Sequence, residues 1–163
     1  PFVDTRGGNK ITVHDEESID AFGVNSIDEI IEDVSKNKYQ VIGIDEIQFL
    51  KGDGEAIRDG ILELLNSGVT IVVAGLDMDY NAVAFEIIKE LMPIADYVYK
   101  HHAVCTKCGT DAWVSHRKVQ GEDRVLIGAE TEYEPLCRSC YNEVRKDEDL
   151  EVNKNQMKLD IVV

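Results

Sequence analysis

Residues 41–49 read V-I-G-I-D-E-I-Q-F, an apolar run that stops at the acidic pair Asp45 and Glu46. A short continuous apolar run is typical of a strand that is buried on both faces of a parallel sheet. Residues 69–74 read V-T-I-V-V-A and form a second run of this kind, which ends before a glycine. The two runs therefore predict two buried strands, each followed by a polar turn.

Apolar residues at helical spacing lie around these strands. Residues 26–34 predict one helix, with Ser26 as its N-cap and Glu29 three residues later in a capping box. Residues 56–65 and 84–91 predict two further helices.

Residues 96–100 (D-Y-V-Y-K) predict another strand, so strand and helix alternate over most of the chain. This alternation predicts an α/β fold with a parallel sheet and crossover helices. Ligands of such sheets bind at the carboxyl ends of the strands. We therefore expect Asp4, Asp45, Glu46 and Asp77 to lie at the ligand-binding edge.

The pattern changes towards the C-terminus. Residues 114–127 predict a hairpin that turns at residues 120–123, helical periodicity ends, and the last residues are charged and weakly patterned. We therefore expect three parts, namely an α/β core at 1–100, a cysteine-containing domain at 101–145 and a charged tail at 146–163.

Two C-x-x-C pairs, Cys105/Cys108 and Cys137/Cys140, lie in the second part. One pair can bind zinc through its own turn, and a second pair completes a tetrahedron. A redox pair would stand alone beside a βαβ unit, and two disulfides would need an oxidising compartment, so the doubled pattern favours zinc. Four thiolates leave no open coordination position, so the zinc is expected to be structural. The nearby histidines are then expected to be surface or packing residues: His101, His102 and His116.

The acidic pair at the end of the first strand has two interpretations. An Asp at a strand tip can hold Mg²⁺ near a nucleotide phosphate, and a Glu beside it can take a proton from a nucleophile. Acidic residues also end strands simply because strand ends are wet. Taken alone, the segment favours the two interpretations about equally.

The 163 residues include 17 Lys and Arg against 32 Asp and Glu, a formal net charge of −15. This charge repels phosphate backbones and anionic lipids, so we expect no nucleic-acid partner and no membrane partner. No apolar run approaches the length of a membrane span, and no basic start precedes an apolar stretch. We expect a cytoplasmic protein.

A series of motifs runs in order along roughly residues 1–142. They are D-T-R at 4–6, I-G-I-D-E-x-Q-F at 42–49, G-L-D-M-D-Y at 75–80, I-A-D-Y-V at 94–98, A-V-C-x-x-C-G at 103–109, I-G at 127–128 and Y-E-P-L-C-R-x-C at 133–140. The series resembles the type II, zinc-containing thymidine kinases. The resemblance implies a P-loop NTPase-like (RecA-like) core with a small zinc-ribbon and lasso domain. It also implies ATP- and Mg²⁺-dependent phosphorylation of the thymidine 5′-hydroxyl to dTMP.

The resemblance also implies roles for individual residues. Glu46 matches the general base that deprotonates the 5′-hydroxyl, and Asp45 matches the Mg²⁺-associated aspartate. Asp4 and Arg6 match a pair that helps to hold magnesium and phosphates. Zinc is implied at the four cysteines, at the base of a loop over residues 119–133 that resembles the nucleoside-covering lasso. Nucleoside-binding roles are implied for Phe49, Leu76, Tyr80, Ser115, Ile127, Gly128 and Tyr133.

The chain departs from the family pattern in two places. The family's G-x-x-x-x-G-K-[ST] loop lies upstream of D-x-R and does not occur in this sequence, so we expect the chain as given to lack the ATP-phosphate cradle and its turnover. Residues 81–85 (N-A-V-A-F) replace the usual R-G-x-P-F, and Tyr80 replaces a usual Phe. The alternative function is a catalytically incompetent zinc-ribbon binding module on an ATPase-like core. The resemblance further implies a homotetramer and feedback by thymidine triphosphate.

Overall fold

The computed structural model describes residues 10–12, 18–119 and 132–159. The chain divides into two compact units. The first unit comprises Pro1–Met78 and Ala84–Val98, and the second comprises Asp79–Val83 and Tyr99–Val163.

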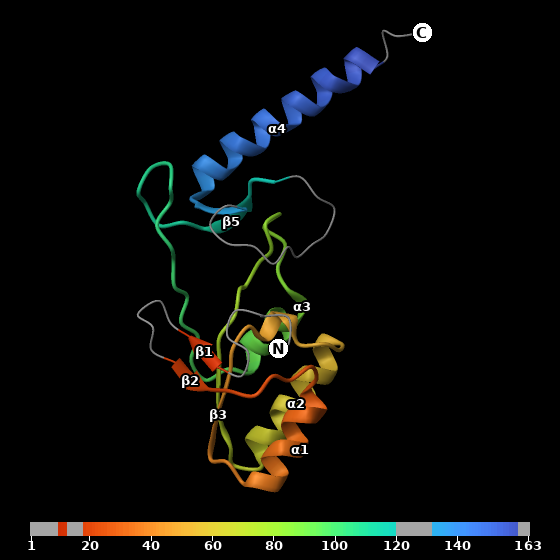
Figure 1. Cartoon of the computed structure of the whole chain (residues 1–163), viewed down its shortest axis with the longest axis vertical. Helices are drawn as coiled ribbons and strands as arrows, with labels where there is room; N and C mark the ends of the chain where they lie inside the picture. The colour runs from red at the N-terminus through yellow and green to blue at the C-terminus, as the bar shows by residue number, and fades with distance from the viewer. Residues whose placement is uncertain (1–9, 13–17, 120–131, 160–163) are drawn as a thin grey trace. The chain divides into compact units, whose positions relative to one another are not determined.

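A parallel strand pair forms the centre of the first unit. Strand β3 (Val41–Ile44) pairs in parallel with β4 (Thr70–Val73), so that Val41 lies opposite Thr70 and Ile44 opposite Val73. The connection between them contains a short 3-10 helix, η1 (Ile47–Phe49), and helix α2 (Gly54–Asn66) (Figure 1). The predicted α/β fold with a parallel sheet is therefore confirmed.

Helix α1 (Ile27–Asn37) forms where the sequence predicts it. The Ser26 side chain accepts a hydrogen bond from the Glu29 N–H, and the Glu29 carboxylate accepts one from the Asn25 N–H at 2.9 Å. The first contact satisfies a backbone donor that the helix itself leaves without a partner. The second contact goes to the residue before the N-cap, whereas a capping box would need the Ser26 N–H as the donor. The helix ends at Lys38, which adopts a left-handed conformation with φ 54°. Ile27, Ile30 and Val34 are its buried residues.

Helix α2 lies against α1 (Figure 1). Asp53 caps its N-terminus by accepting from the Ala56 N–H, and the chain leaves it through Ser67 and Gly68. Gly60 lies at the contact, where a Cβ atom would overlap with Cγ1 of Ile27. A glycine at this position therefore allows the two helices to approach each other closely.

Four shorter elements complete the described part of the first unit. Helix α3 (Glu86–Leu91) confirms the helix predicted at 84–91, and a 3-10 turn, η2 (Met92–Ile94), follows it at Pro93. Strands β1 (Lys10–Thr12) and β2 (Ser18–Asp20) form an antiparallel pair.

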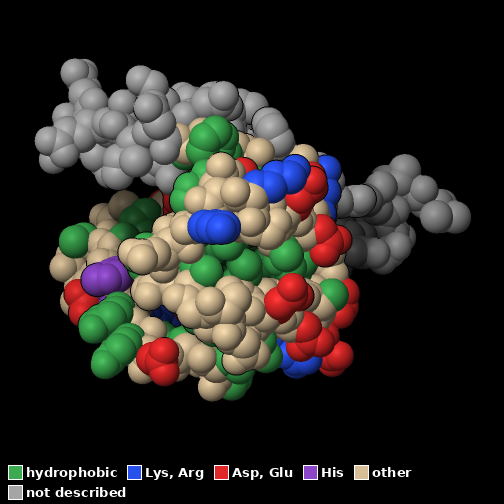
Figure 2. Space-filling model, turned by 90° about the horizontal axis from the view of Figure 1, so that it is seen from below, with side chains coloured by type: hydrophobic (Ala, Val, Ile, Leu, Met, Phe, Trp, Pro, Cys, Tyr) green, Lys and Arg blue, Asp and Glu red, His purple; other side chains and the backbone are tan. Residues whose placement is uncertain are grey.

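Asp and Glu side chains gather along one side of the face shown in Figure 2, in keeping with the net charge.

Two strand predictions are wrong. Residues 96–100 form no strand, because no described strand runs beside them to pair with their backbone groups, and Tyr97 is 79% exposed. Burial of β3 and β4 on both faces is also wrong, since Val41 is 62% and Val72 60% exposed. Side chains alternate along a strand, so Ile44 is buried on one face while Val41 and Val72 are exposed on the opposite face.

The second unit is built around an antiparallel hairpin. Strand β5 (Val114–Arg117) pairs with β6 (Tyr133–Leu136), with Val114 opposite Leu136. The strand predicted from Val114 is confirmed, and among the described residues its partner is β6, whose Leu136 packs in the buried cluster together with Cys140. The turn predicted at 120–123 lies outside the described residues.

Helix α4 (Arg138–Leu159) follows directly after β6, so the expectation that helical structure ends in this part of the chain is wrong. The helix has charged residues all round rather than an apolar stripe, and a search for apolar spacing therefore misses it. Tyr141 and Val144, in its first turns, pack on the core of the second unit.

No helix in the described part of the chain is both long and apolar enough to cross a membrane.

Candidate functional site

The acidic pair lies at the carboxyl end of β3, as predicted. Backbone hydrogen bonds from Ala74 to Ile44 (2.9 Å) and from Ile47 to Ala74 (3.1 Å) tie this end to the end of β4. Asp45 accepts from the Glu46 N–H at 2.9 Å. Glu46 has φ 53°, a left-handed conformation that is uncommon outside glycine and often found at functional sites.

Gln48 connects the two strand ends through its side chain. It is only 8% exposed, and its Nε2 donates to the Glu46 carboxylate at 2.5 Å. Its Oε1 accepts from the Leu76 N–H at 3.0 Å. Sequence reasoning gave this residue no role. The sequence feature that could have identified Gln48 is its polar side chain between two apolar residues, Ile47 and Phe49.

Phe49 lies one residue further along the same turn. Its ring meets that of Phe85 edge to face, with the two centroids 6.4 Å apart. Phe85 is buried and precedes α3, so it supports Phe49 from one side. Leu76 is 48% exposed. The first unit therefore brings Asp45, Glu46 and Leu76 to one sheet edge, with Phe49 on the turn beside them. Phe85 was not among the predicted site residues.

Tyr80, Ser115 and Tyr133 belong to the second unit. The Arg117 guanidinium lies over the Tyr80 ring, 3.9 Å from its centroid, and the Tyr141 hydroxyl donates to the Tyr80 carbonyl at 3.2 Å. Ser115 lies on β5, and Tyr133 lies on β6 opposite Arg117. Four predicted site residues lie outside the described residues: Asp4, Arg6, Ile127 and Gly128.

The altered loop after Tyr80 has its own supports. Asp79 is buried, and its carboxylate accepts from the N–H groups of Asn81 and Val83, each at 3.0 Å. Ala82 takes a left-handed conformation with φ 60°. The replaced residues thus form a compact turn that is held by one carboxylate.

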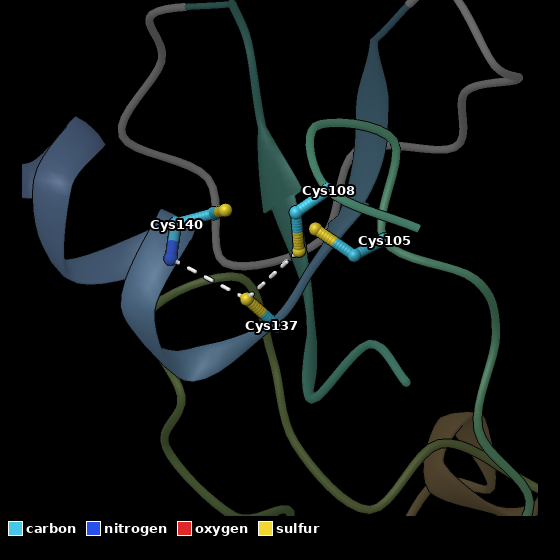
Figure 3. Close-up of side chains that lie close together, drawn as sticks. All are labelled: Cys105, Cys108, Cys137 and Cys140. Atoms are coloured by element: carbon cyan, nitrogen blue, oxygen red, sulfur yellow. Dashed lines mark hydrogen bonds between the residues drawn. The ribbon is translucent and has the colours of Figure 1, made fainter. Parts of the chain in front are cut away.

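The four cysteines come together in the second unit, as predicted (Figure 3). Cys105 and Cys108 lie on a turn before β5, and Cys137 and Cys140 lie at the start of α4. All four sulfur atoms lie within 4.8 Å of one another, and those of Cys108 and Cys137 are 3.6 Å apart. A tetrahedral zinc ion with Zn–S bonds of about 2.3 Å requires sulfur atoms about 3.8 Å apart. The donor set therefore fits such an ion.

The electrostatics of the cluster also suit a cation. Backbone N–H groups, that of Cys137 first, lower the pKa of Cys105 to about 6, and the backbone of Cys140 lowers the pKa of Cys137. The hydrogen bond with Cys137, together with burial, raises the pKa of Cys140 to about 12. Negative charge on some sulfurs thus disfavours ionisation of the others, and a dication among them removes this conflict.

His116 is a buried packing residue in the second unit, in agreement with the expectation from the sequence. Its Nε2 lies 3.1 Å from a carboxylate oxygen of Glu148 on α4, and its Nδ1 lies 3.5 Å from one of Glu134 on β6. Its ring also meets Tyr141 edge to face. These two glutamate contacts were not predicted, because neither glutamate is near His116 in the sequence.

Comparison with known proteins identifies the family. The family model described as thymidine kinase matches residues 1–141. The thymidine kinase of Bacteroides thetaiotaomicron is 40% identical over 149 residues, which cover 91% of this chain and 72% of that protein. The thymidine kinase of Porphyromonas gingivalis is 39% identical over 142 residues, covering 86% of this chain and 67% of that protein. This chain belongs to the thymidine kinase family.

Proposed function

We propose that this protein transfers the γ-phosphoryl group of ATP to the 5′-hydroxyl of thymidine and so forms dTMP. Membership of the family supports this activity. The observation that carries the proposal is the turn at Asp45 and Glu46, which presents two carboxylates at the carboxyl edge of a parallel strand pair. This edge is where ligands of α/β sheets bind.

Glu46 is the proposed general base. A primary hydroxyl is a poor nucleophile, and a carboxylate within hydrogen-bond reach accepts its proton as the new bond to phosphorus forms. The Gln48 amide donates to one carboxylate oxygen of Glu46. A carboxylate has several lone pairs, so this contact leaves capacity to accept the substrate proton.

Asp45, with Asp4 and Arg6, is proposed to bind the phosphates and their magnesium ion. Carboxylate oxygen is a preferred ligand of Mg²⁺, and the Asp45 carboxylate, which accepts from the Glu46 N–H, lies at the end of the strand where the phosphates are expected. Bound Mg²⁺ supplies charge neutralisation at the transferring phosphoryl group. Arg6 would add a fixed positive charge there.

The nucleoside contacts are carried over from the family resemblance as proposals. Phe49, backed by Phe85, offers a ring face to thymine. Tyr80 is held in place by Arg117 and by the Tyr141 hydroxyl. The full proposed set is Phe49, Leu76, Tyr80, Ser115, Ile127, Gly128 and Tyr133.

We propose a structural zinc ion at the four cysteines, at the base of a lasso over residues 119–133. We also propose a P-loop NTPase-like (RecA-like) core over residues 1–100, a zinc-ribbon domain over 101–145, a homotetramer, a cytoplasmic location and feedback by thymidine triphosphate. The fit of the sulfur positions to a tetrahedral ion supports the zinc assignment.

The test is steady-state thymidine phosphorylation by the full-length protein with ATP and Mg²⁺. Glu46→Gln keeps the side-chain shape but removes proton acceptance, so kcat should fall by about 10²- to 10⁴-fold. Thymidine affinity should change far less. Glu55→Gln, an exposed carboxylate on α2, is the matched control and should leave kcat unchanged. Near-normal turnover by Glu46→Gln would contradict the base assignment.

A further inference from the structure

Gln48 is a buried polar side chain whose two amide atoms serve two different parts of the first unit. Its neighbour Ile47 is fully buried, and Gln48 itself is 8% exposed. A buried amide without partners would cost about 1–3 kcal/mol, so both of its ends are expected to make hydrogen bonds. One end donates to Glu46 and the other accepts from Leu76.

The contact with Leu76 determines which way the amide faces. A backbone N–H only donates, so Leu76 requires the amide oxygen on its side. The amide nitrogen must then point towards Glu46, where it donates at 2.5 Å. The orientation of the donor at Glu46 is thus set by the end of the neighbouring strand.

Gly75 is part of the same arrangement. A Cβ atom at this position would overlap with Oε1 of Gln48 and would lie 3.0 Å from Cγ2 of Ile47. Only glycine therefore leaves room for the Gln48 oxygen to reach the Leu76 N–H. Residues that follow both strands, Glu46 after β3 and Gly75 and Leu76 after β4, therefore surround the amide group of Gln48.

We propose that Gln48 is a positioning residue, which holds the Glu46 carboxylate in the orientation that accepts the thymidine 5′-proton. The proposal rests on Glu46 being the general base. A Glu side chain has three rotatable bonds, and a hydrogen bond to one oxygen selects one orientation among many.

A small displacement of a catalytic group is costly, since a misplacement of about 1 Å can reduce a rate by about 10²-fold. Gln48→Met in the full-length protein keeps the length of the side chain and removes both hydrogen bonds. We expect kcat to fall by about 10- to 100-fold, with a much smaller change in the KM for thymidine. Ile61→Val, a buried change on α2 outside the site, is the control for stability, and it should keep its kcat while its Tm falls.

Gln48→Glu is the second variant, in case Gln48→Met does not fold. It can still accept from Leu76 but cannot donate to Glu46, and it adds a like charge. Its kcat should fall at least as far. A merely structural role would predict that each variant loses activity only in proportion to its loss of folded protein, which thermal unfolding of the same samples measures.

The double variant Glu46→Gln/Gln48→Met separates the two proposals. If Gln48 acts through Glu46, the double variant should be as slow as Glu46→Gln alone. The positioning role would be overturned, and the base assignment left intact, by either of two results. In the first, the double variant loses the product of the two single-variant losses in kcat. In the second, Gln48→Met keeps a kcat within twofold of the unchanged protein while Glu46→Gln is slow. Near-normal turnover by Glu46→Gln would overturn the base assignment, and with it the role of Gln48.

Discussion

Replacing Cys108 by Ser should remove the metal from the second unit and unfold that unit. Cys108 supplies one of four sulfur atoms that lie within 4.8 Å of one another, and serine is a poor ligand for zinc. Three remaining cysteines cannot complete the tetrahedron. Ser139→Ala, an exposed change between two of the ligands, is the matched control and should keep the metal.

The expected magnitude follows from the small size of the core. Apart from two of the cysteines, the buried cluster described around the metal site consists of Ala112, Val114, Leu136 and Tyr141. Burial of a large apolar side chain contributes about 1.5–3 kcal/mol. A structural zinc ion contributes about 10–16 kcal/mol in zinc-finger peptides. The metal is therefore expected to be the largest single contribution, and its loss is comparable to the whole typical stability of a domain, about 5–15 kcal/mol.

The assay combines elemental analysis with amide hydrogen exchange. The unchanged protein should contain one zinc ion per chain, and β5 and β6 should exchange slowly. In the Cys108→Ser variant, and in the unchanged protein after chelation, both strands should exchange rapidly while α1 and α2 remain protected. A metal-free protein with slow exchange in β5 and β6 would refute the reasoning.

Four further outcomes are expected. Asp45→Asn should raise the Mg²⁺ concentration needed for half-maximal thymidine phosphorylation, measured by metal titration. Thymidine should raise Tm and purine nucleosides should not, as followed by thermal unfolding. Gly60→Ala should destabilise the protein by about 1–3 kcal/mol in urea, and Ile27→Ala in the same chain should relieve the overlap. Glu90→Gln, which breaks the 2.6 Å ion pair with Arg58, should cost about 1 kcal/mol, less at high salt.

The sequence predicts well those elements whose signals are local. Helix α1 has an apolar stripe and an N-cap serine within a few residues, and both are found in the structure. Helix α4 has no stripe, so spacing alone does not reveal it. The burial of β3 depends on what covers each face, and an apolar run carries no information about that.

The same difference separates the site residues. Asp45 and Glu46 are predictable because they directly follow a strand, and the cysteines because their spacing repeats. The contacts of Gln48 with Leu76 and of His116 with Glu148 join residues that are 28 and 32 positions apart. Their partners are decided by strand register and helix placement, which single-sequence patterns do not specify.

The uncovered face of the β3–β4 pair has a consequence for the protein in solution. Val41 and Val72 present apolar side chains to water, and among the described strands none pairs with the outer edges of β3 and β4. Exposed edges and apolar faces favour association between molecules. A net charge of −15 opposes it by repulsion. Raising the salt from about 0.1 M to about 1 M shortens the screening length from about 10 Å to about 3 Å, so light scattering should rise as this colloidal protection is lost.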